Sequence, residues 1–179
     1  MAKNEGTVKN LSNTFIITAG LLLTGCATGK CGLTLDAVGP VPAGPVAAGS
    51  TNGMLVVYSA YRVGADFNSR DSRRPEYSSY KIFRADGKLL RRVGNDSGTE
   101  LQDPVTVPLL AGNYRVVARA NGYGDVTVPV VIATGQGTVL HLEGGNPWPD
   151  ESVFNHTNAV RLPDGQVVGW RASDAGPGR

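Results

Sequence analysis

The sequence predicts an all-β fold, a small antiparallel β-sandwich of about seven strands that is preceded by a signal peptide and a flexible linker. Short runs rich in β-branched and aromatic residues recur between turns made of Gly, Asn and Asp. The 24 Gly and 11 Pro supply many turns, and 41% hydrophobic residues are enough to bury a core. After residue 25 no helical period of adequate length occurs, which disfavours alternating β/α units.

Residues 1–25 are predicted to be an export signal. Lys3 and Lys9 form a basic start, and residues 15–23 form an apolar stretch of nine residues. A helix that spans a membrane needs about twenty such residues. The stretch is therefore expected to act as a signal that is removed, and not as a permanent anchor.

The end of this signal reads Leu23-Thr24-Gly25-Cys26. It resembles the lipobox of bacterial lipoproteins, in which an aliphatic residue and two small residues precede a modified cysteine. The resemblance implies cleavage after Gly25 and acyl chains such as palmitate on Cys26, which would hold the protein on a membrane of the cell envelope. Ala27 follows in place of Asp, which implies the outer membrane where the bacterium has one. The alternative is an ordinary secretory signal with an incidental cysteine.

Residues 26–50 are predicted to be a lipidated linker rich in Gly, Ala and Pro. Repeated Pro favours extended backbone over a helix or a central strand. We expect this segment to tether the folded domain to the bilayer. Cys31 is expected to be a free thiol, because Cys26 is committed to lipid; pairing with another chain and a second acylation are the alternatives.

The folded domain is predicted over residues 51–145. Residues 54–62 are expected to form a buried strand, whose core face would consist of Met54, Val56, Tyr58 and Ala60. Residues 79–84 and 89–93 flank Asp86-Gly87, a pair that suits the positive φ angles of a tight hairpin turn.

Four further strands are expected, over residues 104–110, 114–120, 126–132 and 138–143. In residues 114–120 the apolar side chains alternate with Arg115 and Arg119, so one face should be buried and the other wet. Residues 146–179 are predicted to be an extension with a hairpin over residues 159–170. Its tryptophans, Trp148 and Trp170, are expected to cap the sandwich, with an exposed pair that binds a glycan as the alternative.

The second half of the domain contains a turn and strand over residues 110–116, a Gly122-Tyr123 corner and the strand Val128-Pro129-Val130. Together these residues resemble the closing half of carboxypeptidase regulatory-like domains. The resemblance covers about residues 95–144 and extends less clearly to residue 53. It implies a transthyretin-like or immunoglobulin-like sandwich and a domain that is generally non-catalytic. A polar insertion, residues 64–78, departs from the pattern.

The charged and reactive residues indicate no particular chemistry. The formal net charge is only +2, whereas nucleic-acid binding requires clustered basic residues, so we expect no nucleic-acid partner. The sequence has no HExxH, CxxC or GxSxG motif, and we therefore expect no metal, no cofactor and no enzymatic activity. His141 and His156 are expected to be structural. A degenerate or unrecognised hydrolase of envelope polymers remains the alternative.

The insertion supplies the candidate ligand-binding residues, Arg70, Arg73, Arg74 and Tyr77. Arginine forks bind phosphate or carboxylate, and flat aromatic rings such as those of Phe67 and Tyr77 suit a sugar or a peptide. The alternative is a solvated loop whose arginines pair with Asp71 and Glu76. Together these features predict a non-catalytic, lipid-anchored envelope protein whose sandwich presents a binding or structural surface to an envelope glycan or protein. A carbohydrate-binding module is a further alternative.

Overall fold

The computed structural model describes residues 32–40, 51–64, 74–95, 103–144 and 155–172. All of these residues belong to one compact unit that starts at Gly32. They form strands and turns and contain no helix, which confirms the predicted all-β fold. Among them there is accordingly no helix of the length and hydropathy that crossing a membrane requires.

Twelve strands make up the described part of the chain. In chain order they are β1 Leu33–Thr34, β2 Asn52–Tyr58, β3 Tyr61–Gly64, β4 Arg74–Tyr77, β5 Tyr80–Arg84, β6 Leu89–Val93, β7 Val107–Leu110, β8 Gly112–Ala120, β9 Gly124–Ile132, β10 Gly137–His141, β11 Ala159–Arg161 and β12 Val167–Trp170.

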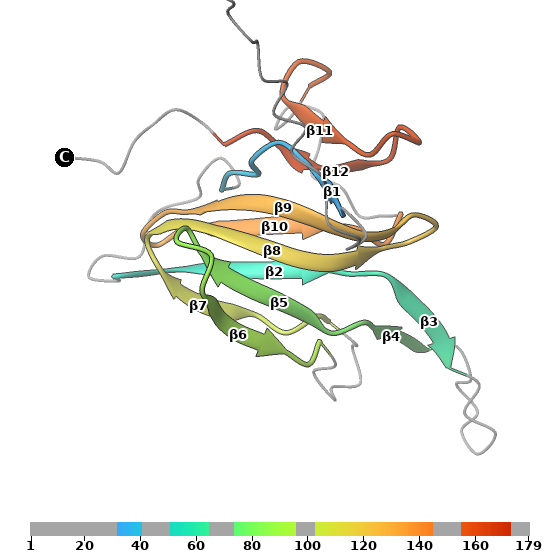
Figure 1. The fold of residues 1–179 in the computed structure, drawn as a ribbon, viewed down its shortest axis with the longest axis horizontal. Helices are drawn as coiled ribbons and strands as arrows, with labels where there is room; N and C mark the ends of the chain where they lie inside the picture. Colours follow the sequence, from blue (N-terminus) through green and yellow to red (C-terminus); the bar gives the residue numbers. More distant parts are fainter. Residues whose placement is uncertain (1–31, 41–50, 65–73, 96–102, 145–154, 173–179) are drawn as a thin grey trace, which may run out of the picture. The chain divides into compact units, whose positions relative to one another are not determined.

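Two sheets carry the fold (Figure 1). One has five strands in the order β1-β9-β8-β5-β6, and the other has three in the order β10-β2-β7. Their buried faces share one hydrophobic core. The five-stranded sheet contributes Tyr80, Ile82, Val93, Val116, Ala118, Val126, Val128, Val130 and Ile132, and the three-stranded sheet contributes Leu55, Val57, Val107, Leu109 and Leu140.

Local turn chemistry explains the hairpins. In the β5–β6 turn, Gly87 adopts a φ of 85°, and the Asp86 carboxylate accepts a hydrogen bond from the Lys88 amide at 2.9 Å. In β8 the side chains of Val116 and Ala118 are buried while Arg115 and Arg119 are exposed, as their alternation predicts.

The pairing of strands differs from an all-antiparallel sandwich in two places. β10 pairs with β2 in parallel, and β1 pairs with β9 in parallel. The predicted inward face of β2 is also wrong, because Leu55 and Val57 are fully buried whereas Met54 is 46% exposed. Both faces of this strand are apolar, so alternation alone gives no signal for which face is inward.

Part of the expected linker belongs to the fold. β1 lies at the edge of the five-stranded sheet, and Leu35 and Val38 are buried in the core. Val38 also bridges to Val130 of β9 and to Arg171 after β12. Residues 32–40 are therefore not a tether, because three apolar side chains, including that of Leu33, give them a face that packs on the sandwich.

The expected polar insertion also begins and ends in strands. β3 and β4 pair as an antiparallel ribbon, which we call the β3–β4 ribbon. The predicted carboxyl-terminal hairpin is observed as β11 and β12, with Val160, Leu162 and Val168 in the core. Trp170 is buried and its Nε1 donates to the Pro40 carbonyl at 3.0 Å, while Trp148 lies outside the described residues.

Candidate binding groove

The predicted ligand-binding residues are only partly described. Cys26, Arg70 and Arg73 lie outside the described residues. Arg74 is the first residue of β4 and pairs with Gly64, although its side chain is not described. Of the four candidates in the insertion, only Tyr77 has a described side chain, and it lines a groove.

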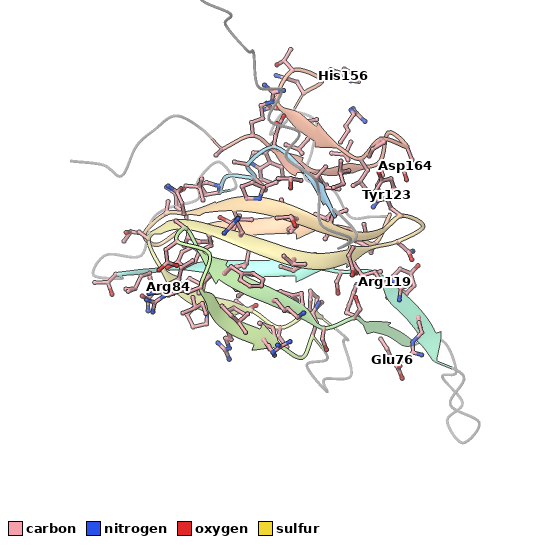
Figure 2. All side chains as sticks on the ribbon, viewed as in Figure 1. Glu76, Arg84, Arg119, Tyr123, His156 and Asp164 are labelled. Atoms are coloured by element: carbon pink, nitrogen blue, oxygen red, sulfur yellow. The ribbon has the colours of Figure 1, made fainter. Side chains whose placement is uncertain are left out.

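This groove, which we call the tyrosine groove, lies between the β3–β4 ribbon and the turn that joins β8 to β9. It has a volume of about 970 Å³. In Figure 2, Glu76, Arg119 and Tyr123 lie toward the same end of the sandwich, whereas Arg84 lies at the other. The side chains that define the groove are those of Tyr61, Arg62, Glu76, Tyr77, Arg119 and Tyr123.

The β3–β4 ribbon forms one wall. Tyr61 pairs with Tyr77 and Arg62 pairs with Glu76 across the ribbon. The rings of Tyr61 and Tyr77 meet at an angle of 66° with centroids 6.1 Å apart. Arg62 and Glu76 form an ion pair at 3.9 Å, but both side chains are largely exposed, so this contact contributes little to stability.

A buried hydrogen-bond network fixes the base of the ribbon. Ser59, which precedes β3, donates from Oγ to the carbonyl of Ser78, which follows β4, at 2.6 Å. Buried Asn95 donates from Nδ2 to the Val57 carbonyl and to Ser59 Oγ at 2.7 and 3.0 Å. Asn95 also accepts a bond from the Val105 amide at 3.1 Å. The ribbon therefore starts from a rigid base, although it extends away from the two main sheets.

The β8–β9 turn forms the opposite wall. Gly122 and Gly124 adopt φ angles of 71° and 113°, which L side chains rarely adopt, so the turn depends on glycine at these positions. Asn121 holds the turn to the other sheet, because its Nδ2 donates to the Glu143 carbonyl at 3.0 Å. Tyr123 is 42% exposed at the groove.

A buried polar and aromatic cluster adjoins the tyrosine groove on the ribbon side. Tyr58 stacks on His141 with ring centroids 4.4 Å apart and an interplanar angle of 9°. The rings of Tyr58 and Tyr77 meet at 82° with centroids 5.8 Å apart. His141 Nδ1 lies 2.7 Å from Glu143 Oε1, and both side chains are about 95% buried. The second oxygen of Glu143, Oε2, makes no hydrogen bond with any described residue.

This environment raises the pKa of two tyrosines. Burial raises the pKa of Tyr77 to about 12, and the negative charge of Glu143 contributes to the rise. Burial raises the pKa of Tyr58 as well, with Asp103 and Glu143 as the neighbouring charges. Like any tyrosine, Tyr77 is protonated near neutral pH and can donate a hydrogen bond to a molecule in the groove; the raised pKa extends this to more alkaline pH.

The groove offers three kinds of contact. Tyr61 and Tyr123 present exposed aromatic surface, Tyr77 presents a hydroxyl group, and Arg62 and Arg119 present positive charge. Arg119 lies directly opposite Asp125 across β8 and β9, although the two side chains do not form an ion pair within 4.0 Å. Such a surface can bind a polar ligand that has a flat apolar face and an acidic group.

Sequence reasoning found Tyr77 but missed the residues opposite it. Arg119 was predicted to face outward, which its exposure confirms, yet nothing local relates it to residues 61–77. The Gly122-Tyr123 corner was noted only as a turn. Among the described residues no group of three or more His, Cys, Asp or Glu side chains is placed to hold a metal ion.

Comparison of the chain with family models, with curated proteins and with solved structures finds no match. The resemblances to bacterial lipoproteins and to carboxypeptidase regulatory-like domains therefore stay predictions from the sequence. The structure itself establishes an all-β sandwich with a groove at one end.

Proposed function

We propose that this chain is a non-catalytic, lipid-anchored protein of the cell envelope that binds an acidic saccharide in the tyrosine groove. The observation that carries this proposal is the gathering of three tyrosines and two arginines around one groove of about 970 Å³. These residues come from two walls that are distant in sequence, the β3–β4 ribbon and the β8–β9 turn.

The chemistry of the lining favours a saccharide over a purely apolar ligand. Tyrosine combines an apolar ring, which can cover the flat face of a sugar, with a hydroxyl group that hydrogen-bonds. The planar guanidinium of arginine binds carboxylate or phosphate through two parallel hydrogen bonds. The same acidic group also has candidate contacts in Arg70 and Arg73, which lie between β3 and β4 in the sequence, and in Arg74, the first residue of β4.

The proposed anchor is the lipid on Cys26, and its support is the sequence Leu23-Thr24-Gly25-Cys26 after a short apolar stretch. The bilayer is thus one partner of the protein, and an envelope glycan is the other. Ala27 favours the outer membrane in a bacterium with two membranes.

A hydrolase would need an acid or a base that reaches its substrate. The His141–Glu143 pair has the residue types for such chemistry, but both side chains are buried and neither lines the groove. Their position favours a structural role, in which the pair supports Tyr58 beside the groove wall.

The test is calorimetric titration of the purified protein with acidic and neutral oligosaccharides. The variant Tyr61→Ala/Tyr123→Ala should bind both classes about tenfold more weakly, because it removes both exposed rings. The variant Arg119→Gln should weaken binding of the acidic class alone.

Leu89→Ala/Leu90→Ala is the matched control. These leucines are 43% and 36% exposed, close to the 42% and 36% of Tyr123 and Tyr61, and they do not line the groove. Equal binding by the tyrosine variant and this control would exclude the groove as the saccharide site.

A further inference from the structure

The outer face of the five-stranded sheet carries three cations at one corner, Lys81 of β5, Arg92 of β6 and Arg119 of β8. Lys81 pairs with Arg92 on one side and with Val117 on the other, so their side chains share a face. Arg119 lies two residues beyond Val117 and therefore points to that face as well. The three residues, which we call the cationic corner, line a hollow of about 360 Å³.

The charges of this corner are not balanced within the described part of the chain. All three side chains are exposed, and none forms an ion pair with a described residue. Lys81 and Arg92 lie directly opposite each other, an arrangement in which like charges destabilise a sheet. The one acid that lines the hollow is Asp125, which lies directly opposite Arg119, so three cations face a single carboxylate and the corner keeps a net positive charge.

The described chain begins on the same sheet, at the edge opposite to β6 and next to Asp125 of β9. Leu33 of β1 pairs with Val126 of β9, and a Cβ atom built on Gly32 would lie 3.3 Å from the carbonyl oxygen of Asp125. Cys26 precedes Gly32 by six residues. An extended chain spans at most about 3.5 Å per residue, so a tether of six residues reaches at most about 21 Å.

We propose that the cationic corner binds the phosphate groups of anionic phospholipids in the bilayer that holds Cys26. The inference rests on the proposed function in one respect, because the lipid anchor on Cys26 is what brings the bilayer near. The contact itself is inferred from the charges of the corner and from where the described chain begins. A short tether that starts on the same sheet keeps this sheet near the headgroups, where each Lys or Arg strengthens binding about fivefold. A second copy of the chain fits this face poorly, because its own cationic corner would repel the first.

The test uses the chain from residue 26 onward with Cys26→Ser, which contains the whole compact unit and cannot carry the thioether lipid. Its binding is measured to phosphatidylcholine vesicles with and without phosphatidylglycerol, at low and high salt, and to polygalacturonate. We expect binding to the anionic vesicles that high salt abolishes. Lys81→Gln/Arg92→Gln should weaken this binding roughly twentyfold, because it removes two cations.

The matched control is Arg84→Gln/Lys88→Gln, which removes the same charge from the other end of the β5–β6 hairpin (Figure 2). It should keep most of the binding. Equal losses in the two variants would show a net-charge effect and overturn the proposal, as would absence of vesicle binding by the parent chain. Binding to polygalacturonate without binding to vesicles would overturn it in favour of an acidic polysaccharide.

Arg119 lines both the tyrosine groove and the hollow of the cationic corner, so the test of the corner leaves it unchanged. Neither Lys81 nor Arg92 lines the tyrosine groove, so their replacement should leave saccharide binding unchanged. Fatty-acid labelling of the unmodified chain tests the anchor independently of both sites.

Discussion

His141 and Glu143 form a contact that is buried in the described part of the fold. Their atoms lie 2.7 Å apart with about 95% of each side chain buried. Removal of one partner from a buried pair leaves the other without compensation, which is more destabilising than removal of both. Sequence alone assigned His141 a structural role but gave no indication of its partner, since acidic side chains in strands are mostly exposed.

We predict that His141→Leu lowers the free energy of unfolding by about 3 to 5 kcal/mol, because Glu143 would then be a buried carboxylate without a partner. The double variant His141→Leu/Glu143→Leu should lose less. Urea denaturation of the parent, both single variants and the double variant gives the interaction free energy. Strictly additive losses would show that the two side chains do not act as a pair.

A second prediction at the scale of one residue concerns the ionisation of Tyr77. Its pKa is raised from 10.0 to about 12 in the folded protein, so the neutral form favours folding. The contribution is complete below pH 10.0 and is lost as the pH rises toward about 12. Tyr77→Phe cannot ionise, and its free energy of unfolding should therefore fall less steeply than that of the parent across this range. Parallel curves for the two proteins would contradict the assignment.

At the scale of elements, β1 shows how a very short strand can matter to the core. Its segment donates from the Leu35 and Val38 amides to the Thr127 and Pro129 carbonyls at 2.9 and 2.8 Å. Val38 is fully buried, and Leu35 is 8% exposed. A folded domain defined from residue 51 would therefore lack an edge of its main sheet.

We predict that a chain starting at Thr51 is less stable than one starting at Gly32 by about 3 to 6 kcal/mol, from the burial of Leu35 and Val38 alone. This is a large part of the total of about 5 to 15 kcal/mol that is usual for a domain. Thermal and urea unfolding of the two chains would measure the difference. Equal stability would mean that the segment 32–40 packs on the sandwich without contributing to it.

The elements that were predicted correctly are those with local signals. Asp86-Gly87 indicates the β5–β6 turn, and the alternation of apolar and charged residues indicates the inward face of β8. The segment of β1 was missed because it lies among Gly and Pro and its partner, β9, is distant in sequence. The tyrosine groove was missed for the same reason. Its two walls are distant in sequence and come together only because of the order of the strands in the sheets.

At the scale of the whole molecule, the proposed anchor sets where both proposed sites would act. We predict that Cys26→Ser abolishes incorporation of labelled fatty acid, because serine lacks the thiol on which the modification depends. Membrane fractionation should then show release of the protein, apart from the salt-sensitive fraction held by the cationic corner. A serine variant that still incorporates the label would show that the lipid is attached elsewhere.

The two ends of the described chain are joined in the folded state. Val38 bridges to Arg171, and the carboxylate of Asp36 pairs with the Arg171 guanidinium at 3.2 Å. The parallel pairing of β2 with β10 likewise joins early and late residues. Contacts between residues so far apart in sequence form slowly and only after most of the chain is present. During synthesis from the amino terminus the core therefore stays incomplete until the last strands, whose Val160 and Val168 belong to it, have emerged.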